Sequence, residues 1–323
     1  MQQKLLDLFE SSEGYVSGER LSRELNCSRT AVWKQIEKLR RDGYTFEAVS
    51  RLGYRLTGKP ERLELTKLTA SLRTKLLGRS IRLLDEVTST QNEAHHWVAN
   101  GAQEGSLVVA ERQSAGRGRM GRSWHSPKGK GLWLSLILKP PIPLPYTPQL
   151  TLLVAVALCR TIRLHTSIPA GIKWPNDILL NDRKLSGILL ESSAEDERLR
   201  YVIAGIGIGV NLLKEDYPEE LQPIVTSLLI ETGRSWDRTD LLCAFLGQLE
   251  ELYELYLAKG FSPIRTLWEA HSVSLGKMVR VTMPNGTLEG IAQSIDDMGA
   301  LVVRLPSGEI TRVFSGEVHN TPS

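Results

Sequence analysis

Apolar positions in the first 43 residues recur at the period of an α-helix. The pattern predicts three short helices, over residues 3–11, 18–25 and 29–43, with a brief turn between the second and the third. In the third segment Val32, Ile36 and Leu39 follow the i, i+4, i+7 spacing of one apolar stripe. Ser28 is a favourable N-cap before that stripe, and Gly43 is a favourable stop behind it.

A hairpin pattern follows the third helix. Residues 44–58 alternate apolar and polar side chains on either side of Arg-Leu-Gly, as two short strands joined by a turn do. Helix, turn, helix and hairpin together predict a winged helix-turn-helix domain. In such a domain the third helix, residues 29–41, enters the major groove of DNA.

The side chains opposite the apolar stripe form the outward face of this helix. The candidate DNA contacts on this face and at its start are Ser28, Arg29, Thr30, Lys34 and Arg41. Glu37 lies on the same face and lowers its positive potential. A small helical module that contacts other proteins is therefore the alternative that the pattern leaves open.

Alternating helices and strands fill the next two hundred residues. The predicted strands are 80–87, 105–113, 132–139, 171–174, 177–181, 185–192 and 200–212; helices are predicted from Gln91 and over 148–165 and 240–260. Few neighbouring strands are separated by helices, so a mixed sheet with helices packed on one face is favoured over a doubly wound fold.

Short strands with tight turns make up the rest of the chain, which predicts a small SH3-like β-barrel. Residues 57–64 have the composition of a linker. The predicted class is α+β with three domains: 1–62, a winged helix-turn-helix; 63–270, a central mixed-sheet domain; and 271–323, the barrel.

Charge is unevenly divided along the 323 residues. The first 62 contain twelve Lys and Arg against nine Asp and Glu, whereas the remainder contains 28 of each kind. The whole net charge of +3 therefore lies in the first fifth. A small basic excess of this kind agrees with a DNA-binding domain.

Composition narrows the class of protein further. Apolar residues at 41% and charged residues at 24% are ordinary for a globular chain. The start of the chain lacks the basic and apolar regions of a signal peptide, and the run LTLLVAVALC is half a membrane span. Three scattered cysteines form neither a disulfide framework nor a CxxC metal site. We expect a cytoplasmic protein without a bound structural metal.

A loop rich in arginine and glycine, residues 114–130, precedes one predicted strand. Its sequence matches the spacing of the dinucleotide fingerprint and nearly that of a P-loop. Both motifs require a helix to start at the last glycine, and Pro127 and Gly129 disfavour one. The loop is therefore predicted to lie between strands, with its positive charge on arginine side chains. A solvated basic hairpin loop is the alternative.

Two polar stretches offer further candidate chemistry. TSTQNE, residues 88–93, follows a strand and opens a helix, so its residues form either a capping box or a hydrogen-bonding shelf. Trp174-Pro175-Asn176-Asp177 forces a turn between apolar strands, which places Lys173, Asn176 and Asp177 at a strand end. Lys184 opens the next strand, where a lysine is as often a solvated terminus as a functional group.

Together these segments closely resemble one family. GRGRMGRSW, KWPNDI, RKLSGILLE, TSTQNEA and GIGIGVNL are similar to the motifs of the biotin protein ligases. A helix-turn-helix before them and a small barrel behind them resemble the bifunctional type, which is also the biotin operon repressor. The resemblance extends over the whole chain.

The resemblance implies a reaction and a set of partners. Such enzymes join the biotin carboxylate to the α-phosphate of ATP with Mg²⁺, forming biotinyl-5′-adenylate and pyrophosphate, and then transfer biotin to a lysine of the biotin carboxyl carrier protein of acetyl-CoA carboxylase. As repressors of biotin biosynthesis genes they bind operator DNA as a homodimer, which biotinyl-5′-adenylate promotes. No membrane partner is implied.

Site residues follow from the same resemblance. The biotin-binding set is Ser89, Thr90, Gln91, Gln113, Arg117, Gly118, Arg119 and Lys184. The set for ATP and the adenylate is Arg119, Arg122, Lys173, Asn176 and Asn211. The catalytic set is Arg119, Lys184 and Asp177, and no residue is assigned to a metal. The segment 212–228, which should cover the adenine, contains no tryptophan, so no base-stacking residue is assigned.

Two alternatives stand beside this interpretation. A lipoate ligase of related fold would perform the same activation on another carboxylate. A regulator without enzymatic activity would only sense the small ligand.

Overall fold

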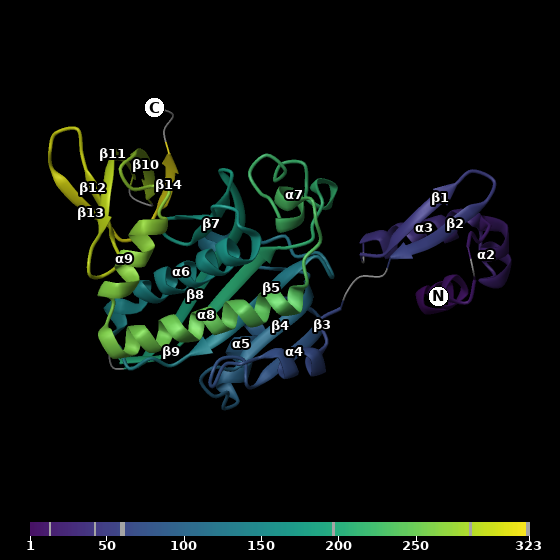
Figure 1. The fold of residues 1–323 in the computed structure, drawn as a ribbon, viewed down its shortest axis with the longest axis horizontal. Helices are drawn as coiled ribbons and strands as arrows, with labels where there is room; N and C mark the ends of the chain where they lie inside the picture. The colour runs from purple at the N-terminus through teal and green to yellow at the C-terminus, as the bar shows by residue number, and fades with distance from the viewer. Residues whose placement is uncertain (13, 42, 59–61, 196–197, 284–285, 321–323) are drawn as a thin grey trace. The chain divides into compact units, whose positions relative to one another are not determined.

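The computed structural model describes residues 1–12, 14–41, 43–58, 62–195, 198–283 and 286–320. The chain divides into two compact units (Figure 1). Residues 1–62 with 127–130 form the first unit, and residues 63–126 with 131–323 form the second. Each unit has a hydrophobic core of its own.

Three helices and a hairpin form the first unit, as the apolar pattern predicts. The elements are α1 (Gln2–Glu10), α2 (Gly18–Glu24), α3 (Arg29–Arg41), β1 (Thr45–Val49) and β2 (Gly53–Gly58), with β1 and β2 antiparallel. The stripe Val32, Ile36 and Leu39 is buried. Ser28 Oγ accepts a hydrogen bond from the Ala31 amide at 3.2 Å, which confirms the predicted N-cap.

A seven-stranded mixed sheet is the centre of the second unit. Its strand order is β3-β4-β5-β9-β8-β7-β6. The strands are β3 (Ile81–Val87), β4 (Leu107–Gln113), β5 (Gly131–Leu138), β6 (Gly171–Lys173), β7 (Asp177–Leu180), β8 (Arg183–Glu195) and β9 (Arg198–Gly209). Only β3 and β4 pair in parallel, and the other neighbours are antiparallel. The mixed sheet is thus confirmed.

Helices cover both faces of this sheet, so the expectation of helices on one face is wrong. The helices are α4 (Leu65–Ser71), α5 (Thr90–Ala99), α6 (Thr147–Thr166), α7 (Leu228–Thr232), α8 (Arg238–Lys259) and α9 (Ser262–His271). Helices α6 and α8 pack side by side over one face (Figure 1). Helix α5 packs over the other, against Val108, Ile137 and Ile203. Successive side chains of a strand point to opposite faces, and β4, β5 and β9 have apolar side chains at successive positions. These strands therefore present apolar side chains to the helices on both faces.

A five-stranded antiparallel sheet closes the chain and completes the α+β fold. Its strands are β10 (Met278–Met283), β11 (Gly286–Ile295), β12 (Leu301–Arg304), β13 (Ile310–Val313) and β14 (Glu317–Asn320), in the order β13-β12-β11-β10-β14. Val279, Val303 and Val318 belong to the same buried core as the central sheet. The division of this unit into domains 63–270 and 271–323 stays a prediction.

Helix α6 forms the centre of the second core. Residues Leu144–Thr166 are long and apolar enough to span a membrane by length and composition, yet 67% of the most apolar window is buried inside the protein. An apolar stretch of this kind, buried within a fold, has the character of a core helix.

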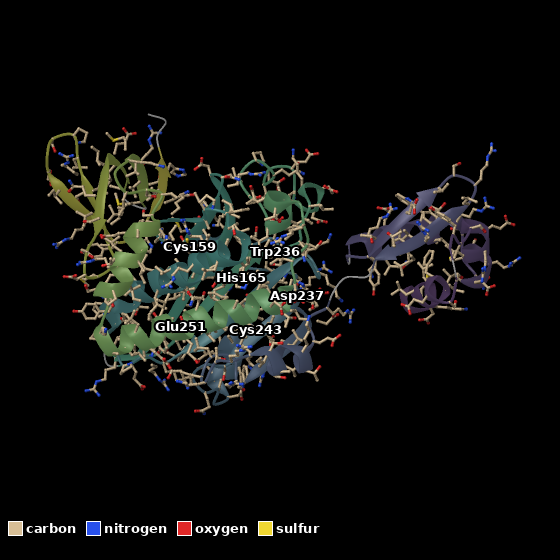
Figure 2. The ribbon with its side chains drawn as sticks, viewed as in Figure 1. Cys159, His165, Trp236, Asp237, Cys243 and Glu251 are labelled. Atoms are coloured by element: carbon tan, nitrogen blue, oxygen red, sulfur yellow. The ribbon has the colours of Figure 1, made fainter. Side chains whose placement is uncertain are left out.

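Three free thiols belong to the chain, and two of them lie in the second unit (Figure 2). Cys159 on α6 is buried, and burial raises the pKa of its thiol to about 12. Cys243 on α8 is half-buried, and burial raises its pKa to about 11. At neutral pH both are therefore neutral thiols, which are poor nucleophiles and poor metal ligands.

A buried ion pair joins the first turn of α8 to the sheet. The Arg238 guanidinium lies 2.8 Å from the Glu111 carboxylate, and the two side chains are 2% and 5% exposed. Glu111 also accepts a hydrogen bond from the Leu63 amide at 2.6 Å, and Arg238 donates one to the Gly131 carbonyl at 3.2 Å. The pair therefore holds the start of the second unit and the start of β5 together.

Replacing Glu111 by alanine is expected to lower the free energy of unfolding by about 3 to 5 kcal/mol, because the Arg238 charge loses its buried partner. Urea denaturation of the full chain measures the change. The matched control is Glu86→Ala, which breaks the exposed pair of Glu86 with Arg112 at 3.4 Å and is expected to cost about 1 kcal/mol or less. Equal losses in the two variants would contradict the prediction.

Candidate active site

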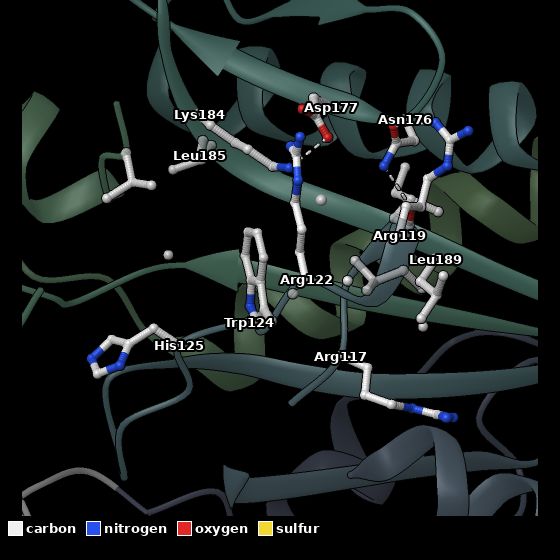
Figure 3. A pocket seen from close by; sticks show the side chains of 18 of the residues that line it. Arg117, Arg119, Arg122, Trp124, His125, Asn176, Asp177, Lys184, Leu185 and Leu189 are labelled. Atoms are coloured by element: carbon white, nitrogen blue, oxygen red, sulfur yellow. Dashed lines mark hydrogen bonds and ion pairs between the residues drawn. The ribbon is translucent and has the colours of Figure 1, made fainter. Parts of the chain in front are cut away.

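A cavity of about 480 Å³ opens in the second unit (Figure 3). This volume is within the range of small-molecule sites. Its walls come from segments far apart in the sequence: the start of α5, the arginine loop, the strands β7, β8 and β9, the segment 217–226 and the start of β14. One cavity therefore collects the polar stretches that the sequence singles out.

Three glycines of β9 form a floor along this cavity. Gly205, Gly207 and Gly209 alternate with Ile206 and Ile208, which are buried in the core. Glycine is required because a Cβ would lie 2.6 Å from Gln91 Oε1 at position 205, 2.1 Å from Trp124 Nε1 at position 207 and 2.6 Å from the Thr226 carbonyl at position 209. At about 3.3 Å per residue, the floor is roughly 13 Å long.

The arginine loop lies between β4 and β5, which are antiparallel neighbours, as the sequence predicts. It contains only a short 3₁₀ turn, Arg119–Gly121, and the Gly118 amide bonds the Arg122 carbonyl at 2.7 Å. Gly116 is packed closely, since a Cβ there would lie 2.5 Å from the Trp124 carbonyl. The loop contains no α-helix whose N-terminus could bind an anion, so its positive charge comes from the arginine side chains.

The arginines of this loop contact three different acceptors. Arg119 donates to Asn176 Oδ1 at 3.0 Å, and Asn176 in turn donates to the Ile188 carbonyl at 2.9 Å. Burial lowers the pKa of the Arg119 guanidinium, whereas the carboxylates of Asp177 and Glu317 oppose that shift. An arginine stays protonated at neutral pH in any of these environments.

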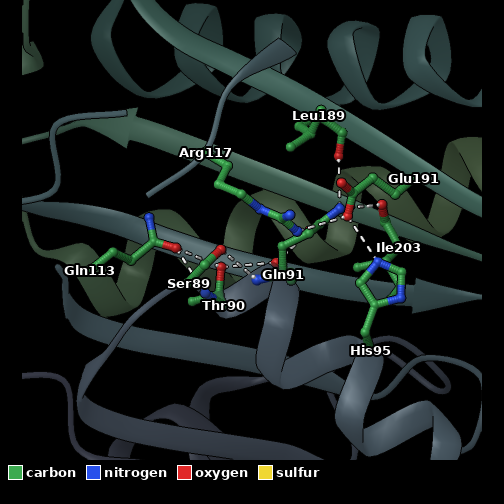
Figure 4. Close-up of polar contacts among 10 residues, drawn as sticks. Ser89, Thr90, Gln91, His95, Gln113, Arg117, Leu189, Glu191 and Ile203 are labelled. Atoms are coloured by element: carbon green, nitrogen blue, oxygen red, sulfur yellow. Dashed lines mark hydrogen bonds and ion pairs between the residues drawn. The ribbon is translucent and has the colours of Figure 1, made fainter. Parts of the chain in front are cut away.

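The other two loop arginines pair with carboxylates. Arg122 makes a two-bond pair with Glu317 of β14, with one bond of 2.9 Å. Arg117 lies at 3.2 Å from Glu191 of β8, which His95 also contacts at 2.8 Å (Figure 4). Both carboxylates are partly exposed, so an arriving anion can compete for these guanidinium groups.

Lys184 lies in the same cavity, at the start of β8. Its Nζ is 2.8 Å from Asp177 Oδ1 and 5.3 Å from the centre of the Trp124 ring. Figure 3 shows the end of the Lys184 side chain beside the Asp177 carboxylate. A lysine held by a carboxylate and an aromatic face has a fixed position, so it is not a solvated strand terminus.

The stretch Ser89-Thr90-Gln91 is both a helix cap and a polar shelf. Ser89 Oγ caps α5 through the Gln91 amide. Gln113 Oε1 accepts from the Thr90 amide at 2.8 Å, and Ser135 Oγ lies 2.9 Å from Thr90 Oγ1 and 2.8 Å from Gln91 Oε1. Figure 4 shows Ser89, Thr90, Gln91 and Gln113 clustered at the start of α5. Such a network fixes the orientation of each group before a ligand arrives.

Aromatic side chains form the other end of the cavity, above Gly207 and Gly209. Trp124 packs on Gly207, while Tyr217 donates its hydroxyl hydrogen to the Thr226 carbonyl at 2.8 Å. His125 lies 2.7 Å from the Asp216 carbonyl and so ties the arginine loop to the segment 213–226. Burial raises the pKa of Tyr217 above its ordinary value.

The structure brings together twelve of the thirteen predicted ligand and catalytic residues. The twelve that line the cavity are Ser89, Thr90, Gln91, Gln113, Arg117, Gly118, Arg119, Arg122, Lys173, Asn176, Asp177 and Lys184. Asn211 is not among the lining residues, because its amide bonds the backbone of Trp236 at 2.9 Å through both Nδ2 and Oδ1. Its role at the nucleotide stays a prediction.

Sequence reasoning missed three residues of this cavity. Trp124 lines the cavity from the arginine loop and was given no role from the sequence, which left the base-stacking residue unassigned. Ser135 is hidden within an apolar strand, and Glu317 lies nearly two hundred residues from its partner Arg122. Gly205 of β9 stands opposite Ser135 and was the available indication of a functional role for Ser135. A glycine there leaves room for a polar side chain on that face.

The predicted DNA contacts lie in the first unit. Ser28, Arg29, Thr30 and Lys34 are exposed around the start of α3. Arg29 pairs with Glu19 at 3.0 Å on the surface. The side chain of Arg41 lies outside the described residues.

A resident metal site is not evident in the described part of the chain. Within it, no three His, Cys, Asp or Glu side chains gather as metal ligands do. Mg²⁺ commonly binds through one or two carboxylates together with substrate phosphates. Asp177 and Asn176 supply oxygen atoms of that kind in the cavity.

Family models match three segments of the chain. A helix-turn-helix domain matches residues 1–55, the biotin/lipoate A/B protein ligase family matches 83–211, and the biotin protein ligase C-terminal domain matches 274–319. These segments follow one another in the order that the sequence resemblance requires.

Similar proteins are found among sequences and structures. The chain is 46% identical to the bifunctional ligase/repressor BirA of Bacillus subtilis, over 98% of both chains. It is 30% identical to that of Escherichia coli, over 98% of this chain and 95% of the relative. The biotin protein ligase from Aquifex aeolicus in complex with biotin and ATP has a TM-score of 0.66 at 32% identity, with 76% of this chain and 100% of that chain covered.

Replacing Arg122 by alanine is expected to raise the pKa of Glu317, because the hydrogen bond from Arg122 is the main cause that holds this pKa below its ordinary value. ¹³C NMR titration of glutamate carboxyls, assigned with Glu317→Gln, measures it. Because the pKa of Glu317 is lowered in the folded state, this carboxylate stabilises the fold at pH values above the ordinary carboxyl pKa. The stabilisation is lost as the pH falls through the lowered pKa.

The control for this titration is Arg112→Ala, which removes an exposed arginine of β4 and leaves Arg122 in place. It is expected to leave the pKa of Glu317 unchanged. An unchanged Glu317 pKa in Arg122→Ala would show that the pair does not hold the carboxylate.

Proposed function

This chain belongs to the biotin protein ligase family, and on that premise we propose that it is both an ATP-dependent biotin ligase and a biotin-responsive repressor. The observation that carries the enzymatic half is the cavity, where a polar shelf, a cluster of cations and an aromatic end follow one another along the glycine floor. This order matches a ligand with a polar ring, an acyl phosphate and a base.

The first chemical step joins two anions. A carboxylate oxygen of biotin bonds to the α-phosphorus of ATP, the bond to the β-phosphate oxygen breaks, and pyrophosphate leaves. Two unit charges 4 Å apart repel by about 4 kcal/mol at an effective dielectric constant of 20. Arg119, Arg122 and Lys184 offset this repulsion by placing positive charge beside both reactants.

The second step transfers biotin to the carrier protein. The ε-amine of the acceptor lysine attacks the adenylate carbonyl, the bond to the phosphate oxygen breaks, the amine loses a proton, and AMP leaves. Lys184 stabilises the negative charge that develops on the carbonyl oxygen. Asp177 holds Lys184 at 2.8 Å and orients it.

The proposed binding roles come from the family resemblance, and the positions of the residues along the floor support them. The ureido end of biotin binds at Ser89, Thr90, Gln91 and Gln113, and its acyl end binds beside Arg117, Gly118 and Arg119. Lys173, Asn176 and Arg122 contact phosphate. Trp124, packed on Gly207, stacks on the adenine, which supplies the aromatic group that the segment 212–228 lacks. Asp177 would hold an Mg²⁺ ion carried by the triphosphate, and that ion would screen the charge of the phosphates.

The repressor half rests on the first unit. Its winged helix-turn-helix places α3 in the major groove of operator DNA, and a homodimer places two such helices on two half-sites. Binding of biotinyl-5′-adenylate favours the dimer and so converts ligand occupancy into DNA affinity. The partners are the biotin carboxyl carrier protein, operator DNA and a second copy of the chain, in the cytoplasm and away from membranes.

Simple assays distinguish the proposed function from two alternatives. A lipoate ligase would exchange pyrophosphate into ATP with lipoate and not with biotin. A ligand sensor without activity would keep its DNA response after Lys184 is removed and would never modify a carrier.

Lys184→Ala is expected to slow carrier biotinylation about 10²- to 10³-fold, the usual loss when one charge-stabilising donor is removed. The assay incubates the variant with biotin, ATP, Mg²⁺ and a carrier domain, and measures the carrier mass. Lys259→Ala, an exposed lysine at the end of α8, is the control and retains activity. Full biotinylation by Lys184→Ala would reject the assigned role.

Operator binding is expected to strengthen when biotin and ATP are both present, because the adenylate favours the dimer. Fluorescence anisotropy with a labelled duplex from the regulatory region of biotin biosynthesis genes measures the affinity at fixed salt. Biotin alone and ATP alone are the controls. Equal affinity in all conditions would remove the repressor half of the proposal and leave the ligase half intact.

A further inference from the structure

Trp33 is a large apolar side chain in an unexpected place on α3. It is 50% exposed, whereas the neighbouring apolar side chains Val32, Ile36 and Leu39 of the same helix are at most 2% exposed. Exposed single hydrophobic residues are common, but an indole is the largest apolar group available. Its place on the outward face of a recognition helix suggests a partner for it.

The surroundings of Trp33 are charged and polar. Arg29 and Thr30 lie one turn before it on the helix, and Lys34 and Lys38 lie farther round on the outward face; all four are exposed. The acidic side chain one turn after it, Glu37, pairs with Arg40 at 2.8 Å. The face around the indole is therefore positive, which is complementary to a polyanion and unlike the apolar surround of a protein–protein anchor.

The helix-turn-helix fold indicates that DNA is the partner of this face. In a helix-turn-helix, residues near the start of the second helix contact base edges in the major groove, and Trp33 is the fifth residue of α3. The one apolar feature that bases present in that groove is the C5 methyl group of thymine. Cations around an apolar group match a groove that has phosphates at its walls and methyl groups on its floor.

We propose that Trp33 sets part of the sequence preference of the first unit by packing its indole against thymine methyl groups in the major groove. Lys34 and Lys38 bind the flanking phosphates and carry no sequence information themselves. The exposed pair of Arg29 with Glu19 is weak, so Arg29 is free to turn to a phosphate. This inference rests on the proposed DNA-binding function and names the group that reads the bases.

The test begins with the full-length protein, biotin and ATP, and a duplex library with a random core. Selection by the unaltered protein recovers its preferred sequence. Each thymine of that sequence is then replaced, one at a time, by deoxyuridine, which pairs identically and lacks the methyl group. The affinity of the unaltered protein is expected to fall about fourfold at each thymine whose methyl group the indole covers.

Trp33→Ala is expected to bind the selected duplex at least tenfold more weakly, because the apolar contact is lost. At the same positions it becomes insensitive to deoxyuridine. Trp33→Phe keeps an apolar ring and retains part of the sensitivity. Lys38→Ala is the control from the same helix: it weakens the binding of selected and unselected duplexes equally and keeps full deoxyuridine sensitivity. It also reduces the slope of log affinity against log salt concentration by about one.

Outcomes separate this inference from the proposal beneath it. If the unaltered protein recovers no preferred sequence, the repressor function itself fails. If it does, and Trp33→Ala retains the same sequence and the same deoxyuridine sensitivity, the role of Trp33 is overturned. Circular dichroism confirms that the helices of the variant are folded. Loss of dimer in sedimentation with methyl sensitivity retained would assign Trp33 to a protein contact instead and likewise overturn it.

Discussion

Positive charge in a half-buried cavity needs an acceptor for each cation, and this constraint shapes the whole site. Lys184 is held by Asp177, Arg119 by Asn176 and Arg122 by Glu317. These acceptors keep the cations ordered before any anion arrives, and partial exposure leaves the pairs weak enough to rearrange. A buried cation without such a partner would destabilise the fold by several kcal/mol.

The central sheet positions these cations by simple means. Alternate glycines at the end of β9, at positions 205, 207 and 209, leave one face of the strand open there, while the isoleucines between them anchor the other face in the core. Ser135 of β5 and Gly187 of β8 stand opposite Gly205 and Gly207 in the register. Three neighbouring strands therefore share the same open surface, and loops need only cover it.

Periodicity predicts the elements of this fold better than it predicts their contacts. The stripe of α3, the apolar strands and the cap at Ser28 follow from local spacing alone, and the family motifs gather Arg119, Lys184 and Asp177 correctly in one cavity. The continuous apolar runs of β4 and β5 did indicate that both faces of the sheet are covered, but no local pattern showed that α5 is the helix on the second face. Glu317 and Trp124 depend on how distant segments meet, which no local pattern encodes.

The two hydrophobic cores have different consequences for how the chain can be divided. The first unit has a hydrophobic core of its own, formed by residues from α1 to β1. The last strands share Val279, Val303 and Val318 with the central core, and Glu317 reaches the arginine loop. The helix-turn-helix unit can therefore be gained or lost as a whole, whereas the last five strands share both the core and a cavity residue with the ligase fold.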